Sequence, residues 1–199
     1  MERRVRRHNK MKILAIHGAW SSSISFNFLK SKIKPKVWET IDYDHRKHSY
    51  EDILNMSTGV INEPYVAIGH SLGGLIALHQ SQNPFCKGII TLASPLAGLD
   101  LNLIQLYLSR SSLIGKIASS SREIRDIHHL NYDHVPVLHL IANKGYNPFI
   151  YEDNDGVLPI KVQTGWTCGE VVEVLANHYE ILQSDKTLFE VMSFLARLS

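Results

Sequence analysis

Long hydrophobic runs are absent from this 199-residue sequence. The first apolar stretch covers only residues 13–16 and leads directly into a His-Gly pair. A helix that crosses a bilayer needs about 20 consecutive apolar residues, and a secretory signal needs a longer apolar segment than this one. Neither a transmembrane helix nor a signal peptide is therefore expected.

Cysteine is also scarce. Cys86 and Cys168 are the only two in the chain, which is too few for a disulfide framework. We therefore expect free thiols and a cytoplasmic location.

Several binding motifs are missing as well. The sequence has no G-x-G-x-x-G motif, no Gly-Lys-Ser/Thr phosphate loop, and neither H-E-x-x-H nor cysteine–histidine zinc spacing. The pairs His45/His48 and His128/His129 are accordingly interpreted as surface or loop residues. Neither a metal nor a cofactor is expected.

The net charge of +2 conceals an uneven distribution. Residues 1–10 contain five Lys or Arg against one Glu, so they carry +4 and leave about −2 on the rest. Because these residues include no aromatics, we interpret them as a disordered basic leader, with Met11 as an alternative start. An arm for nucleic acid or an anionic surface is the alternative, but no nucleic-acid partner is expected.

The remainder, residues 11–199, has the length and composition of one globular domain. Short apolar segments alternate along it with segments of helical periodicity, which is typical of an α/β fold with a mostly parallel sheet. We predict strands at residues 12–17, 37–43, 65–68, 88–93, 135–142 and 170–175, and helices near residues 26–33, 50–61, 72–82 and 184–198. A serine cluster at residues 21–23 is predicted to cap the first helix.

The sequence GHSLGG at residues 69–74 is the centre of this plan. It lies between an apolar strand and a helix, which is the setting in which G-x-S-x-G forms a strained turn that exposes its serine. Gly69 and Gly73 suit such a turn because a β-carbon at either place would collide with its opposite arm. Ser71 is therefore the candidate nucleophile.

A serine hydroxyl needs a base, and the base needs a group that orients it. In parallel sheets, ligand-binding residues follow the carboxyl ends of the strands. Of the histidines, only His178 lies between the last strand and the last helix. Asp153 and Asp155 compete for the acid after the fifth strand, and Asp155 is preferred because its Asp-Gly turn can aim the carboxylate toward the sheet.

An oxyanion in the transition state needs fixed N–H donors. The backbone N–H of Leu72, at the start of the helix, is one candidate. The second is expected in the turn after the first strand, from Ala19, with Trp20 as the alternative.

Taken together, these segments resemble the α/β-hydrolase superfamily, and within it the small bacterial lipases and esterases. The resemblance rests on HGAW at 17–20, GHSLGG at 69–74, ITLASPLAG at 90–98, DNDGVLP at 153–159 and NHYEIL at 177–182. It implies a minimal sheet of about six strands with helices on both faces, a Ser71–Asp155–His178 triad, and Ala19 and Leu72 as oxyanion donors. It also implies a short helical cap within residues 94–131.

The expected activity is that of a serine hydrolase acting on a small-molecule carboxylic ester. Trp20, Leu101, Ile104 and Tyr107 could line an acyl pocket, although leucines at helical spacing more often pack into a core. An acyltransferase or thioesterase with the same triad is one alternative, and a hydrolase-fold binding protein without turnover is another.

Overall fold

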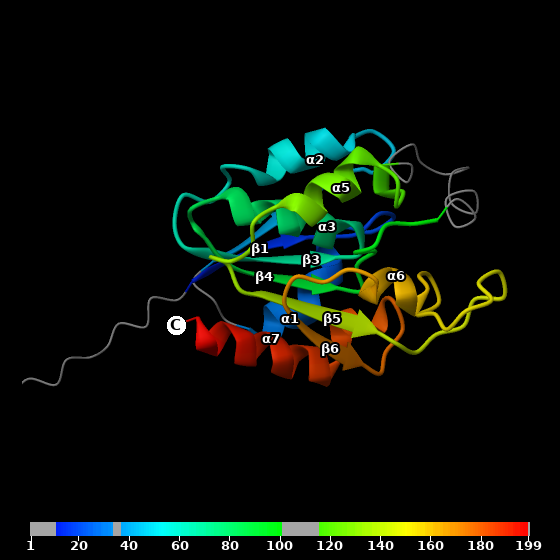
Figure 1. Ribbon diagram of the computed structural model, residues 1–199. Coiled ribbons are helices and arrows are strands. Elements are labelled where there is room, and N and C mark those ends of the chain that lie inside the picture. Colours follow the sequence, from blue (N-terminus) through cyan, green and yellow to red (C-terminus); the bar gives the residue numbers. More distant parts are fainter. Residues whose placement is uncertain (1–10, 34–36, 101–115, 199) are drawn as a thin grey trace, which may run out of the picture.

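A six-stranded parallel sheet forms the centre of the molecule (Figure 1). The computed structural model describes residues 11–33, 37–100 and 116–198. Neighbouring strands pair in parallel in the order β2-β1-β3-β4-β5-β6. The strands are β1 (Lys12–Ile16), β2 (Trp38–Ile41), β3 (Tyr65–His70), β4 (Cys86–Leu92), β5 (Val137–Ala142) and β6 (Glu170–Val174). The predicted fold class is confirmed, and the strands lie at the predicted places.

Helices cover both faces of this sheet (Figure 1). One face carries α2 (Tyr50–Ser57), α3 (Leu72–His79), α5 (Arg122–His129) and α6 (Ile160–Thr164), and the other carries α1 (Asn27–Lys32) and α7 (Asp185–Arg197). Short 3-10 helices are η1 (Ser23–Phe26), η2 (Gln80–Gln82) and η4 (Glu180–Gln183). The helical layers explain why the inner strands read as continuous apolar runs, because both of their faces are covered.

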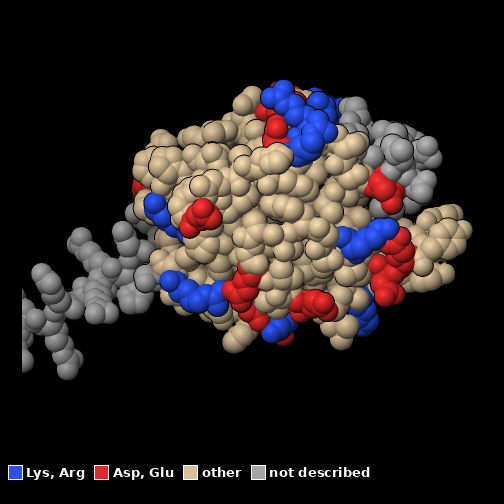
Figure 2. Space-filling view, in the orientation of Figure 1, with Lys and Arg blue, Asp and Glu red and all other residues tan. Residues whose placement is uncertain are grey.

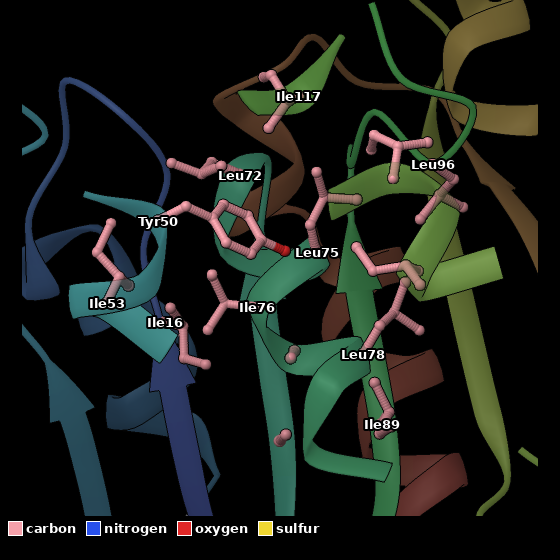
Figure 3. Packing of buried hydrophobic residues seen from close by; sticks show 14 of the residues in the cluster. Ile16, Tyr50, Ile53, Leu72, Leu75, Ile76, Leu78, Ile89, Leu96 and Ile117 are labelled. Carbon is pink, nitrogen blue, oxygen red and sulfur yellow. The ribbon is translucent and has the colours of Figure 1, made fainter. Parts of the chain in front are cut away.

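Alternate side chains of the inner strands β1 and β3 enter different cores. Leu14 and Ile16 pack in the cluster beneath α2 and α3, whereas Ile13 and Ala15 pack in the cluster beneath α1 and α7. Figure 3 shows the first cluster, where the Tyr50 ring from α2 lies among leucine and isoleucine side chains of α3. The sheet is thereby fixed from both sides, and its carboxyl edge is a rigid base for the loops that follow.

Serine side chains begin three of the helices. Ser49 accepts a hydrogen bond from Asp52 N at 3.1 Å, Ser121 caps α5, and Ser184 caps α7. The predicted cap at residues 21–23 is wrong, because the Ser22 side chain makes no cap bond. Ser23 Oγ instead donates to Asp42 Oδ2 at 2.6 Å, so the carboxylate after β2 takes that hydroxyl away from the helix.

Residues 94–131 are described only in part. Leu99 and Ala118 form a parallel bridge, and α5 packs through Ile124 and Ile127 into the layer that contains α3. The leader at residues 1–10 and residues 101–115 of the expected cap fall outside the described residues, so both remain predictions.

Charged residues of both signs are mixed on the face drawn in Figure 2. Several opposite charges of the described residues are paired: Arg197 Nη2 lies 2.6 Å from Glu170 Oε2, Lys186 Nζ lies 2.6 Å from Glu190 Oε1, and Lys161 contacts Glu152. Among the helices that the structure describes, none combines the length and apolar character needed to cross a bilayer.

The packing of α7 gives a test of this fold. We expect Phe194→Ala to lower the free energy of unfolding by about 3–5 kcal/mol, because the ring is 3% exposed in the core beneath the sheet. Phe189→Ala is a matched control on the same helix, since its ring is 63% exposed. It should change stability by less than about 0.5 kcal/mol. Urea unfolding followed by circular dichroism measures both, and equal losses would contradict the packing described.

Candidate active site

Ser71 occupies a strained turn between β3 and α3. Its φ of 53° and ψ of −123° lie in a region that residues with a side chain rarely adopt, at a cost of about 1–3 kcal/mol. A β-carbon on Gly69 would lie 2.2 Å from Gly73 O, and one on Gly73 would lie 2.1 Å from Ile16 O. The glycines therefore let β3, α3 and the end of β1 approach closely enough to form the turn.

The turn after β1 lies against this elbow. A β-carbon on Gly18 would come within 2.9 Å of Ser71 Cβ, so the two turns are in direct contact. Ser71 itself is only partly buried, in contrast to the fully buried β3 that precedes it. The hydroxyl-bearing residue is thus partly accessible at the carboxyl edge of the sheet.

Asp155 and His178 form a buried hydrogen-bonded pair. His178 Nδ1 lies 2.6 Å from Asp155 Oδ2, and the two side chains are 3% and 0% exposed. The competing Asp153 is exposed. The structure therefore brings Asp155, and not Asp153, to the imidazole.

The Asp155 carboxylate is supported by further donors. Its Oδ1 accepts hydrogen bonds from Val157 N at 2.9 Å and Leu158 N at 2.6 Å, and Gln163 Nε2 donates to Oδ2 at 3.0 Å. A buried carboxylate is tolerated when its oxygens are occupied in this way. Gln163 was not anticipated from the sequence, because a glutamine eight residues after an acid belongs to no motif.

His70 connects the loop of His178 to the elbow. Its Nε2–H donates to His178 O at 2.8 Å, and the two imidazole centroids are 4.9 Å apart. His70 precedes Ser71 in the chain, so these contacts bring the His178 loop close to the elbow. Among the described residues, no hydrogen bond joins the Ser71 hydroxyl to His178. Such contacts are often long in proteins without substrate and tighten when it binds. His70 was also missed by the sequence reasoning, which treated it only as part of the turn.

The two oxyanion candidates differ in their hydrogen bonding. Trp20 N–H donates to His45 Nδ1 at 3.2 Å, so this amide is already used. The N–H groups of Ala19 and Leu72 have no acceptor among the described residues, and Leu72 is the first residue of α3. The geometry therefore favours Ala19 over Trp20 as the second donor beside a helix N-terminus.

His17 and Tyr43 hold the turn that carries Ala19. His17 Nδ1–H donates to Gly18 O at 2.7 Å, its Nε2 accepts from Tyr43 N at 3.2 Å, and Tyr43 OH donates to His17 O at 2.8 Å. The rings are stacked with centroids 4.2 Å apart. Burial lowers the pKa of His17, which keeps the ring neutral and able to accept at Nε2.

The paired histidines were expected to be surface or loop residues. His45 and His48 lie in the loop between β2 and α2, whereas His128 and His129 lie on α5, half-buried and exposed respectively. His45 is buried beneath Trp20. His128 stacks on Trp166 with centroids 4.4 Å apart, and its Nε2 lies 2.8 Å from Leu96 O. In the described ranges, no group of three or more His, Cys, Asp or Glu side chains is arranged to hold a metal ion.

The predicted pocket residues are only partly described. Trp20 is 41% exposed beside the elbow. Leu101, Ile104 and Tyr107 lie outside the described residues, so the acyl pocket remains a prediction.

Comparison with solved structures identifies the fold. Across 94% of this chain, the mature lipase of Bacillus licheniformis matches with a TM-score of 0.68 and 15% identity, over 93% of that chain. The monoacylglycerol lipase of Paleococcus ferrophilus matches with a TM-score of 0.66 and 15% identity, over 94% of this chain and 95% of that one. Tomato methylketone synthase I matches with a TM-score of 0.61 and 10% identity, over 96% and 99%.

No protein-family model and no curated protein matches the sequence. The structural likenesses and the strand order show that the chain has the α/β-hydrolase fold. Identities this low establish the fold alone, and the reaction must be argued from the site.

The burial of His70 predicts a dependence of stability on pH. Burial lowers its pKa from 6.5 to about 3, so between these values the unfolded chain binds a proton that the folded chain does not. Stability should therefore fall as the pH drops below about 6.5, by up to about 1.4 kcal/mol per pH unit. We expect His70→Gln, which keeps an N–H donor, to show a shallower fall between pH 6 and pH 4.5. His129→Gln, at an exposed position on α5, is the control. Identical slopes in urea unfolding for wild type and His70→Gln would contradict this role.

Proposed function

We propose that this protein is a serine hydrolase that cleaves carboxylic esters through an acyl-enzyme intermediate. The proposal rests on the buried Asp155–His178 hydrogen bond, which lies beside a strained turn bearing Ser71. A buried acid–imidazole pair next to a partly exposed hydroxyl is the combination that nucleophilic catalysis by serine requires.

In this proposal each group has a part that its hydrogen bonds support. Asp155 Oδ2 accepts from Nδ1–H, which leaves Nε2 of His178 as an unprotonated acceptor for the Ser71 proton. The serine oxygen then forms a bond to the ester carbonyl carbon, and the imidazolium gives its proton to the departing alcohol as the carbon–oxygen bond breaks. Water attacks the acyl-enzyme by the same route in reverse, which releases the carboxylic acid and regenerates Ser71.

The N–H groups of Ala19 and Leu72 would hold the negative oxygen of each tetrahedral intermediate. Both lack acceptors among the described residues, and they flank Ser71 from two turns that touch each other. Donors fixed in this way need no reorganisation during reaction, and each contributes about 10²–10³ in rate.

The names of similar solved structures bear on the substrate class. Two of the similar structures are named lipases, one of them for monoacylglycerols. We therefore infer a small ester with an apolar acyl group as the substrate. The tomato methylketone synthase has the same fold although its name indicates another reaction. An assay of this protein must therefore identify the product as well as measure turnover.

Replacing the nucleophile is the direct test. We expect Ser71→Ala to lose at least about 10⁴-fold in kcat on short-chain p-nitrophenyl esters, and to lose all labelling by a fluorophosphonate probe. Ser22→Ala, which changes an exposed serine beside the first turn, should retain both activities. Free carboxylic acid is the expected product, whereas esters of an added alcohol would indicate acyl transfer. An unlabelled wild type, or equal labelling of Ser71→Ala, would refute the proposal.

The acid is tested by an isosteric pair of substitutions. Asp155→Asn should lower kcat by about 10⁴-fold, because the amide no longer accepts from Nδ1–H and the imidazole is held in the wrong tautomer. Asp153→Asn, two residues away and exposed, should change kcat by less than about threefold. Steady-state kinetics at a pH near 8 distinguishes them, and a larger loss in Asp153→Asn would reverse the assignment.

A further inference from the structure

Gln163 takes no part in the reaction proposed above, yet its side chain is completely buried beside the acid. It lies on α6 and is 0% exposed. Its Oε1 accepts from Ala142 N at 3.0 Å, and its Nε2 donates to both Ala142 O at 3.1 Å and Asp155 Oδ2 at 3.0 Å. Both amide hydrogens are thus used, so the orientation of the amide is determined by its partners.

The position of Ala142 explains how this contact can hold the Asp155 side chain in place. Ala142 is the last residue of β5, and the glutamine amide pairs with both of its backbone groups. The end of β5 is part of the sheet. The Nε2–H that reaches Asp155 is therefore held in a fixed position relative to the sheet. The donors to Oδ1, in contrast, are two amides of the same loop that carries Asp155.

The oxygen that Gln163 contacts is also the one that faces the imidazole. Asp155 Oδ2 accepts from Gln163 Nε2 and from His178 Nδ1. With two donors on each oxygen, the four acceptor positions of the carboxylate are filled and its plane is fixed. Loss of the glutamine donor would leave Oδ2 held only by the group that it is supposed to orient.

We propose that Gln163 is a positioning residue that fixes Asp155 Oδ2 toward His178 Nδ1. This inference rests on the proposed function. A purely structural role, in which the amide only closes the end of β5, is the competing explanation, and pH-dependent kinetics separate the two.

The decisive variant is Gln163→Glu. In its protonated form, the introduced carboxyl can still donate toward Asp155 Oδ2 and accept from Ala142 N. Once the pair is ionised, two carboxylates face each other in a buried site, which is strongly unfavourable. We therefore expect the ratio of variant to wild-type kcat to fall at least about tenfold between pH 6 and pH 9, with KM changed less than about threefold.

Gln80→Glu is the matched control, because it makes the same change in an equally buried amide. Gln80 is 2% exposed and bonds Tyr65 OH and Ser57 Oγ at the C-terminal end of α3, whereas Ser71 precedes the N-terminal end of that helix. If burial of a new carboxyl acted only through stability, both variants would show the same pH dependence. We expect the Gln80→Glu ratio to stay level across this range.

Gln163→Met removes the donor without adding charge. It should lower kcat by about 10–100-fold at every pH and slow fluorophosphonate labelling of Ser71 in proportion. In proton NMR, the low-field Nδ1–H signal of His178 should shift or broaden in this variant and remain unchanged in Gln80→Glu. If Gln163→Met unfolds at the assay temperature, the change with pH in the kcat ratio of Gln163→Glu to wild type decides between the positioning role and the purely structural role.

The outcomes separate the two proposals. A wild type without turnover or labelling removes the proposed function, while the NMR signal still tests whether Gln163 positions Asp155. A wild type that turns over, together with a level kcat ratio in Gln163→Glu and wild-type kcat in Gln163→Met, would overturn the inference alone.

Discussion

The site depends on a carboxylate that has been removed from water. Asp155 is fully buried, and an isolated ionised group at such a place would be costly. Four donors offset this cost, of which only one belongs to the proposed base. The loop from β5 to α6 is therefore shaped chiefly by the need to surround this side chain. Gly145 serves the same end, because a β-carbon there would lie 2.0 Å from the Asp155 carbonyl carbon.

A second constraint acts at the opposite side of the site. The strained conformation of Ser71 persists because β1, β3 and α3 are packed too closely for the turn to relax. The His178 loop is tied to this rigid element by His70 and to the acid by the bond from His178 N to Asp155 O, which is 2.9 Å long. The backbone of His178 is thus held at both its N–H and its carbonyl group, and the ring is held by Asp155 through Nδ1.

The sequence predicted the parts of this arrangement that follow from strand ends. Parallel strands bring their carboxyl ends to one edge, so residues after β3, β5 and β6 had to converge, and Ser71, Asp155 and His178 were candidates for that reason. Gln163 and Tyr43 were not predictable in this way. Their contacts depend on how a short helix and a strand exit dock on the edge, and such docking leaves no spacing rule in the chain. The serine cap failed for a related reason, because Asp42 is distant in sequence and competes for Ser23.

The two candidate oxyanion donors, the N–H groups of Ala19 and Trp20, differ in whether an internal acceptor already binds them. Ala19 and Trp20 are adjacent, and the sequence alone left both open. The structure commits the Trp20 amide to His45, at a residue whose φ of 55° turns the chain away from the strand direction. The stacked His17 and Tyr43 rings hold the same turn, and within the described part of the chain the Ala19 amide has no acceptor. An N–H without an internal partner is costly unless it meets water or a ligand. The turn is held on both sides of Ala19, and the Ala19 N–H is available to a ligand. An anion-binding role for that amide would require this arrangement.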